Sequence, residues 1–99
     1  MIYLIAYDIS TDRIRQKVAR RLIAEGYERL QWSVFTGLKH PQQQGTLWTD
    51  LSHWLHPEPT ARFVVIPIAL SHFRRLQLIG PSDQLDIDYL TGQGHSLFF

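Results

Sequence analysis

IYLIAYDI, residues 2–9, is the stretch of sequence from which the fold can be inferred. Its β-branched and aromatic residues predict a strand. The side chains that alternate along it are apolar on both faces until Asp8, so we expect this strand to lie in the centre of a sheet with both faces covered. The segment has no basic lead-in and Asp8 interrupts its apolar run, which favours a strand over a signal peptide.

Two amphipathic helices are predicted from capping residues and from apolar side chains at helical spacing. The first helix can be capped by Ser10 or Thr11 and is ended by Gly26. The second begins after Thr46 and stops before Pro57. The remaining predicted elements are strands at 29–36 and 62–68, a short helical turn at 71–75, a brief strand at 76–79, and weak strand candidates at 84–90 and 96–99.

This order of elements predicts an α/β (α+β) fold, a two-layer sandwich with two helices on one face of a four- to five-stranded sheet. Two helices leave the other face uncovered, so we expect a partner there. A chain of 99 residues also builds only a marginal core by itself, which favours an oligomer. We divide the chain into a core at 1–80 and a C-terminal extension at 81–99.

The composition argues against several classes of protein. The chain has no cysteine, which excludes disulfides and thiolate metal sites and fits a cytoplasmic location. No stretch is long enough to cross a membrane, so no membrane partner is predicted. A phosphate-binding glycine loop and a nucleophile elbow are both missing from the sequence.

Positive charge is concentrated in one short segment, although the net charge is only +1. Half of the ten Lys and Arg residues lie between positions 13 and 21, with no acid among them. Four of these residues are predicted to face solvent and to bind a nucleic-acid backbone: Arg13, Lys17, Arg20 and Arg21. The alternative interpretation is an ordinary solvated helix face.

Asp8 and Arg15 are the two charged residues placed where apolar residues are expected. Asp8 ends the first strand, where a carboxylate carries a desolvation cost unless it is paired or binds a cation. It can also simply mark the strand end and help to cap the next helix. Arg15 falls within the apolar arc of the first helix, so its guanidinium either reaches toward Asp8 or extends to a phosphate.

The segment 29–36 is expected to present two different faces as a single strand. Leu30, Trp32 and Val34 form its apolar face, which we expect to meet the helices. The opposite face is basic, polar and aromatic, a mixture that suits contact with a sugar-phosphate chain and one stacked base. Its members are Arg29, Gln31, Ser33 and Phe35.

Three motifs in this order resemble the Cas-two family of CRISPR-associated proteins. They are Tyr7-Asp8-Ile9-Ser10, the run from Asp12 to Ala19, and Gln31-Trp32-Ser33-Val34-Phe35. The resemblance covers roughly the first eighty residues. It implies a ferredoxin-like fold, a homodimer in which the two sheets face each other, and C-terminal strands that pack on the partner subunit.

The resemblance also implies a role in spacer acquisition during antiviral defence. Family members are metal-dependent endonucleases that act on single-stranded RNA or double-stranded DNA, and they bridge dimers of the Cas-one integrase. By position, Asp8 matches the metal aspartate, with one Mg²⁺ shared between the two Asp8 residues of a dimer. The residues matched to the catalytic cleft are Asp8, Arg15, Arg29, Ser33 and Phe35.

Three functions therefore remain open at this point. The first is a magnesium-dependent phosphodiesterase, a hydrolase with its metal held between two chains. The second is a non-catalytic adaptor that binds a short duplex and the integrase. The third, more distant, is a toxin-type ribonuclease of related fold. The consequence of replacing Asp8 separates the first function from the second.

Overall fold

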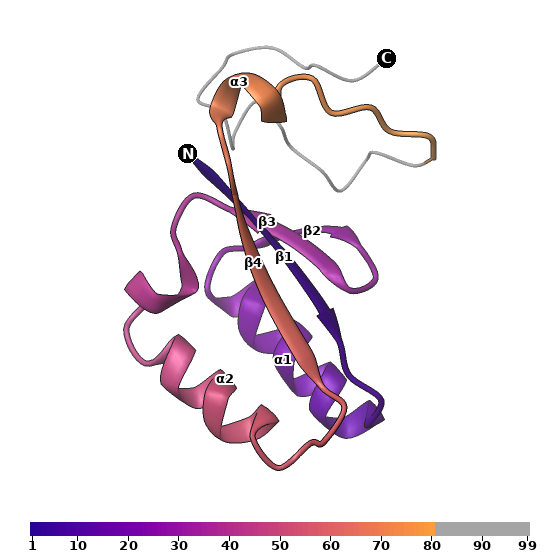
Figure 1. Cartoon of the computed structure of the whole chain (residues 1–99), viewed down its shortest axis with the longest axis vertical. Helices are drawn as coiled ribbons and strands as arrows, with labels where there is room; N and C mark the ends of the chain where they lie inside the picture. Colours follow the sequence, from indigo (N-terminus) through magenta and orange to yellow (C-terminus); the bar gives the residue numbers. More distant parts are fainter. Residues whose placement is uncertain (81–99) are drawn as a thin grey trace.

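The computed structural model describes residues 1–80, and Figure 1 shows the order of their elements. The predicted strands in the C-terminal extension, and its packing on a partner, lie outside the described residues. The elements are β1 (Ile2–Asp8), α1 (Asp12–Ala24), β2 (Glu28–Gln31), β3 (Val34–Gly37), the 3-10 turn η1 (Pro41–Gln43), α2 (Leu47–Leu55), β4 (Arg62–Ile68) and α3 (Leu70–Phe73).

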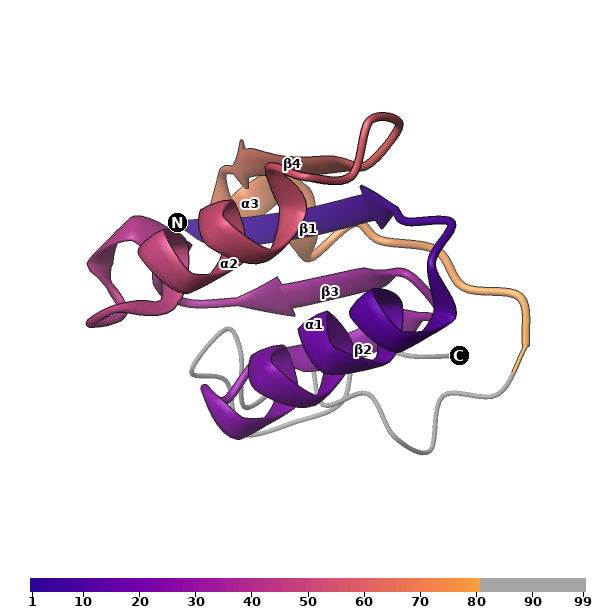
Figure 2. The same cartoon turned by 90° about the horizontal axis from the view of Figure 1, so that it is seen from below.

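The four strands form one antiparallel sheet in the order β2-β3-β1-β4. The central position predicted for the first strand is confirmed, because β1 pairs with β3 on one side and with β4 on the other. In register, Leu4 lies opposite Thr36 on β3 and opposite Ile66 on β4. Helices α1 and α2 lie on the same side of this sheet (Figure 2), as predicted for a ferredoxin-like sandwich.

The main hydrophobic core lies between the two helices and one face of the sheet. The strand residues Ile5, Tyr7 and Phe35 contribute to it. From α1 the buried residues are Ile14, Val18, Ala19 and Leu22, which recur at helical spacing as the sequence predicted. Alternation along β1 therefore directs Leu4, Ala6 and Asp8 to the other face.

The segment 29–36 is a hairpin, and its prediction as a single strand was wrong. β2 ends at Gln31, β3 begins at Val34, and Trp32 and Ser33 form the turn between them. A register shift between Arg29 and Gln31 accompanies the turn. Nothing in this run resembles the glycine-, proline- or asparagine-rich turns that sequence reasoning detects, so the alternating pattern was continued through it.

The hairpin reverses the predicted faces of this segment. Phe35 is fully buried in the core between sheet and helices, whereas the Trp32 side chain is 68% exposed. Each had been assigned to the opposite environment. The turn and the irregularity in β2 reset the alternation of side chains, so a pattern counted from Arg29 does not predict which way residues after the turn point.

The far side of the sheet is partly covered at one end. α3 confirms the predicted helical turn, and its Phe73 packs with Ile2 in a second, smaller cluster. The predicted strand at 76–79 is wrong, because this segment forms no strand. On β4, Val64 and Ile66 remain 47% and 42% exposed. An apolar strip of the sheet is therefore left uncovered by the described residues.

The helix ends agree with the sequence in position more than in chemistry. Gly26 follows α1 with φ +92°, a conformation that glycine adopts readily, and its N–H donates to the Ile23 carbonyl. Thr11 and Thr46 occupy the N-cap positions, but neither makes a side-chain capping bond. Among residues 1–80, every helix is too short and too polar for a membrane span.

Candidate functional site

Asp8 is the last residue of β1 and is exposed on the face of the sheet away from the helices. Its register partner on β4 is Arg62, and the two residues line a shallow hollow together with Ala6, Tyr7 and Val64. Within residues 1–80 its carboxylate makes no hydrogen bond or ion pair. Because the Asp8 side chain is exposed and has no partner among residues 1–80, the described part of the chain imposes no desolvation cost on it and leaves it able to bind a cation.

Arg15 does not pair with Asp8, so that possible contact is excluded. Its guanidinium forms an ion pair with Asp12 and donates through Nη1 to the Ile9 carbonyl at 3.1 Å. The second bond ties Arg15 to the backbone just beyond Asp8. Its Nε is buried and has no partner among the described residues. Arg15 is therefore held at the end of β1, with part of its donor capacity unused.

Arg29 lies between two aromatic rings on the helix side of the sheet. Its Cζ is 4.9 Å from the centroid of the Trp32 ring and 5.1 Å from that of Phe35. Its Nη2 donates to the Trp32 carbonyl at 3.0 Å, and its buried Nε has no partner among the described residues. Two cation–π contacts and one hydrogen bond thus fix the guanidinium in one position.

The hairpin turn is attached to the end of β1. The backbone N–H of Tyr7 donates to the Ser33 carbonyl at 3.1 Å. This contact brings Ser33, Arg15 and Arg29 to the same end of the sheet as Asp8. Asp8 lies on the open face, whereas both arginines reach this end from the helix side. Four of the five predicted catalytic residues are therefore gathered at one end of the molecule.

Phe35 is the exception, and its prediction as a base-stacking residue at the cleft is contradicted by its burial. It is 0% exposed and stacks against Tyr7 with ring centroids 6.1 Å apart. A ring in this position cannot reach a nucleobase unless the core opens. Its contribution is to pack the core and to support Arg29 from below.

The predicted basic face of α1 is smaller than the sequence indicated. Arg13 and Arg20 are exposed, and the Lys17 ammonium lies 4.4 Å from the centroid of the Trp54 ring. Arg21 instead bridges the two helices, with Nη1 2.7 Å from Asp50 and Nε 3.0 Å from Glu25. The hydrogen bonds that Arg21 donates to these carboxylates, first that to Asp50, raise the pKa of Arg21. The positive charge of Arg21 is thus balanced by two carboxylates within the fold. The position of Arg21 on the helix did not predict this pairing.

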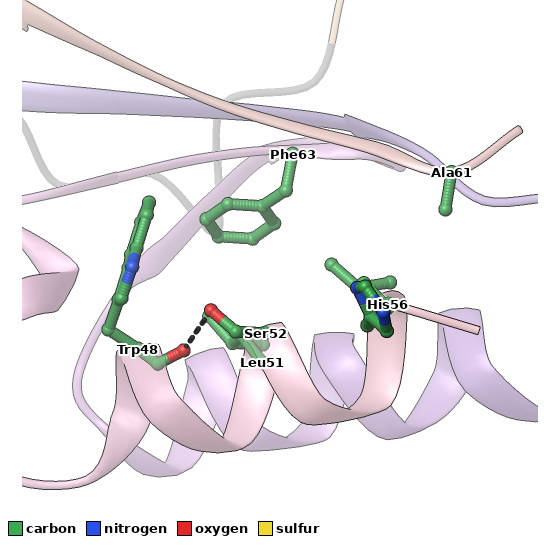
Figure 3. Close-up of a pocket in the computed structure, with 7 residues that line it drawn as sticks. Trp48, Leu51, Ser52, His56, Ala61 and Phe63 are labelled. Atoms are coloured by element: carbon green, nitrogen blue, oxygen red, sulfur yellow. Dashed lines mark hydrogen bonds between the residues drawn. The ribbon is translucent and has the colours of Figure 1, made fainter. Parts of the chain in front are cut away.

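A second hollow lies between α2 and β4, and Figure 3 shows its lining. Trp48, Leu51 and Phe63 contribute apolar side chains to its lining, and Ser52 and His56 contribute polar ones. The Ser52 hydroxyl donates to the Trp48 carbonyl at 2.8 Å and is thereby tied to its own helix. No carboxylate or guanidinium lines this hollow, so it lacks the groups for phosphodiester chemistry. Elsewhere in residues 1–80, no three metal-ligating side chains gather into a cluster.

Trp32 and Arg62 are the residues at this end that sequence reasoning did not assign to the site. Trp32 was expected to face the helices, and only the hairpin explains its exposure. Arg62 is the strand partner of Asp8, a relation that depends on the pairing of β1 with β4. The sequence contains Trp32 and the arginines Arg15, Arg20 and Arg29, but it does not show that the fold brings them together.

Comparison with known proteins agrees with this architecture. The family model described as CRISPR associated protein Cas2 matches residues 1–76. The CRISPR-associated endoribonuclease Cas2 2 of Pyrobaculum aerophilum is 51% identical over 41 residues, which are 41% of this chain and 45% of that protein. The CRISPR-associated endoribonuclease Cas2 1 of Archaeoglobus fulgidus is 29% identical over 65 residues, 66% of this chain and 69% of that protein.

A solved structure shows the same fold. The crystal structure of Streptococcus pyogenes Cas2 at pH 6.5 superposes with a TM-score of 0.58 and 24% sequence identity, and the alignment covers 81% of this chain and 100% of that chain. At this identity the likeness concerns the fold alone. Together with the family model matched over residues 1–76, these findings show that the chain belongs to the Cas2 family.

Proposed function

We propose that this chain is a metal-dependent endonuclease that hydrolyses phosphodiester bonds as a homodimer during CRISPR spacer acquisition. The carrying observation is the free carboxylate of Asp8 at the same end of the sheet as the guanidiniums of Arg15 and Arg29. A carboxylate can hold a cation, while fixed guanidiniums can hold the phosphates of a nucleic acid. Single-stranded RNA and double-stranded DNA are the two substrate classes.

The names of the relatives favour RNA as the substrate class. Both curated proteins similar to this chain are called endoribonucleases. The first matches over less than half of its own length, so its activity is carried to this chain as a proposal. Serine and arginine side chains at the end of β1 would contact the sugar-phosphate chain of either nucleic acid.

The dimer is needed because one carboxylate is too few to fix a magnesium ion. Asp8 lies on the same face of the sheet as the exposed apolar residues Val64 and Ile66. Two copies that bury this strip against each other about a two-fold axis would each bring one Asp8 to the interface. The same burial would add apolar surface to a small core.

In this arrangement the residues have separate tasks. The two Asp8 carboxylates would hold Mg²⁺, which supplies activation of water and stabilisation of developing charge. Without a cation the two carboxylates would repel each other, so one would tend to retain a proton. Arg15 and Arg29, fixed by their contacts to Ile9 and Trp32, would hold a phosphate of the strand on the helix side, next to the stretch that passes Asp8.

The test is cleavage of labelled single-stranded RNA and duplex DNA, with and without magnesium, by the wild type and by Asp8→Asn. We expect magnesium-dependent cutting that is lost in the variant. Glu28→Gln is the matched control, because Glu28 begins β2, at the end of that strand away from the turn at Trp32, and lies level with Leu4 in the middle of β1. Size-exclusion chromatography and circular dichroism check that each variant keeps its dimer and fold. Equal cutting by Asp8→Asn and the wild type would remove Asp8 from catalysis.

The runner-up function is a non-catalytic adaptor that bridges Cas-one integrase dimers on a duplex. The exposed guanidiniums of Arg13 and Arg20 on α1 favour it, because they suit phosphate contacts that need no metal. It predicts that Asp8→Asn still supports integration. It also predicts that the double variant Arg13→Ala/Arg20→Ala binds duplex more weakly, with a salt dependence reduced by about two units of slope.

A further inference from the structure

Trp32 lines a hollow that it shares with three arginines. The hollow lies between α1 and the β2-β3 turn and has a volume of about 270 Å³. This is near the lower limit of small-molecule sites and leaves room for one flat group rather than a large ligand. Its lining residues are Arg15, Gln16, Ala19, Arg20, Ile23, Arg29 and Trp32.

The Trp32 ring has one face occupied and the rest of its surface largely free. The Arg29 Cζ lies 4.9 Å from the centroid of the Trp32 ring and 5.1 Å from that of Phe35. Arg29 therefore links a ring of the core to a ring of the surface, because Phe35 is fully buried and Trp32 is 68% exposed.

The charged groups around the ring are suited to a phosphate. Arg15 and Arg29 line the hollow with their guanidiniums, and Arg20, which also lines it, is exposed. An exposed indole beside guanidiniums is the arrangement by which proteins hold an unpaired nucleotide, with the base on the ring and its phosphate on the arginines. In a duplex the faces of the bases are already stacked on one another.

The place of Trp32 relative to Asp8 also disfavours a duplex. Trp32 lies in the turn next to Ser33, whose carbonyl accepts from the Tyr7 N–H beside Asp8, so the turn and the end of β1 are only about one strand spacing apart, roughly 5 Å. Asp8 and Trp32 nevertheless line hollows on opposite sides of the sheet end. A chain that contacts both must therefore turn sharply around this end. Double-stranded DNA is too stiff for such a turn.

We propose that Trp32 stacks on an unpaired nucleobase while Arg15, Arg20 and Arg29 hold the adjoining phosphate, so that the ligand class of this site is single-stranded nucleic acid. This inference rests on the proposed function, since it assigns a specificity-determining residue to the same end of the sheet. The stacked base lies outside the bond that is cut. The residue therefore selects the strand and performs no chemistry.

The test measures binding by fluorescence anisotropy in the presence of a chelator, so that no cutting occurs. The probes are a labelled single-stranded RNA, the same strand annealed to its complement, and a strand of equal length that lacks bases at its central positions. The proteins are the wild type, Trp32→Ala, Trp32→Phe and, as a matched exposed apolar control, Leu38→Ala. Thermal unfolding checks that each variant is folded.

We expect Trp32→Ala to bind the single-stranded RNA about 5- to 100-fold more weakly, the range for loss of one stacked base. Trp32→Phe, which keeps a ring, should recover most of the affinity, and Leu38→Ala should match the wild type. On the duplex and on the strand lacking bases, Trp32→Ala should have no more than a twofold effect.

Two results overturn the inference. Equal weakening of all three probes would mean that Trp32 acts only by holding Arg29, and unchanged binding of the single strand would mean that no base stacks there. The cleavage assay with Asp8→Asn is independent of this outcome. If the protein cuts in a magnesium-dependent way but Trp32 has no effect on binding, only this inference is overturned. If binding depends on Trp32 but no cutting occurs, only the proposed nuclease function is overturned.

Discussion

Replacing Phe35 by alanine tests whether this side chain packs the core, as the structure shows, or contacts the substrate, as the sequence predicted. In the structure the side chain is 0% exposed and touches Tyr7 and Arg29 in the core. Removal of a fully buried phenylalanine costs about 3–5 kcal/mol, because the lost transfer free energy and the resulting cavity both destabilise the fold. A domain of this size has a total stability of about 5–15 kcal/mol.

The measurement is urea unfolding followed by circular dichroism at a fixed protein concentration, because dimerisation makes stability depend on concentration. With a slope of about 1–3 kcal/mol per molar urea, the loss should lower the midpoint by roughly 1–5 M. Phe35→Leu is the matched control, since it keeps most of the volume and should cost about 1.5 kcal/mol or less. Nucleic-acid cleavage is then measured at low temperature, where the fraction folded is known.

We expect the activity of both variants to follow the folded fraction, with no further loss in Phe35→Leu beyond the share of molecules unfolded. The reasoning is refuted if Phe35→Ala keeps the wild-type midpoint but loses cleavage or RNA binding. That combination would mean that the ring touches the substrate and that the core opens to expose it.

Two further predictions test the packing at the end of β3 and the link between helices α1 and α2. Gly37→Ala should destabilise the fold by about 1–3 kcal/mol, because a Cβ there collides with the ring of Tyr27, whose hydroxyl donates to a loop carbonyl. Urea unfolding measures this loss of stability. An unchanged midpoint would contradict the close approach of Gly37 to Tyr27. The hydrogen bond from Arg21 lowers the pKa of Asp50 below 3.8. The ionised Asp50 therefore contributes to the free energy of unfolding above pH 3.8, and this contribution is lost as the pH falls further. The melting temperature of the wild type should exceed that of Asp50→Asn at pH 7, and the difference should disappear in acid.

The sequence predicts well where one periodicity continues without interruption. β1, α1, α2 and β4 are found near their predicted limits, because long apolar stripes at one spacing leave few other ways to bury them. The central position of β1 also followed, since both of its faces are apolar. These elements alone suffice to place Asp8 at the end of a central strand.

The rest depended on contacts between distant parts of the chain. The turn at Trp32 and Ser33 carries no typical turn residue, so the faces of Phe35 and Trp32 were exchanged in the prediction. Arg21 was assigned to nucleic acid because its neighbours in sequence are basic, while Asp50 reaches it from the other helix. The metal role of Asp8 came from the family resemblance, and the dimer, the magnesium ion and the integrase stay predictions.

The bond between the Tyr7 N–H and the Ser33 carbonyl has a consequence for how this segment can vary. It clamps the turn to the end of β1, and the register shift in β2 already accommodates one irregularity. Inserting or deleting a residue between Arg29 and Val34 would rotate the stack of rings and guanidinium out of line with the strand that carries Asp8. We therefore expect the length of this segment to be more restricted than the identity of its exposed side chains. Single-residue deletions there should abolish binding while leaving helices α1 and α2 folded.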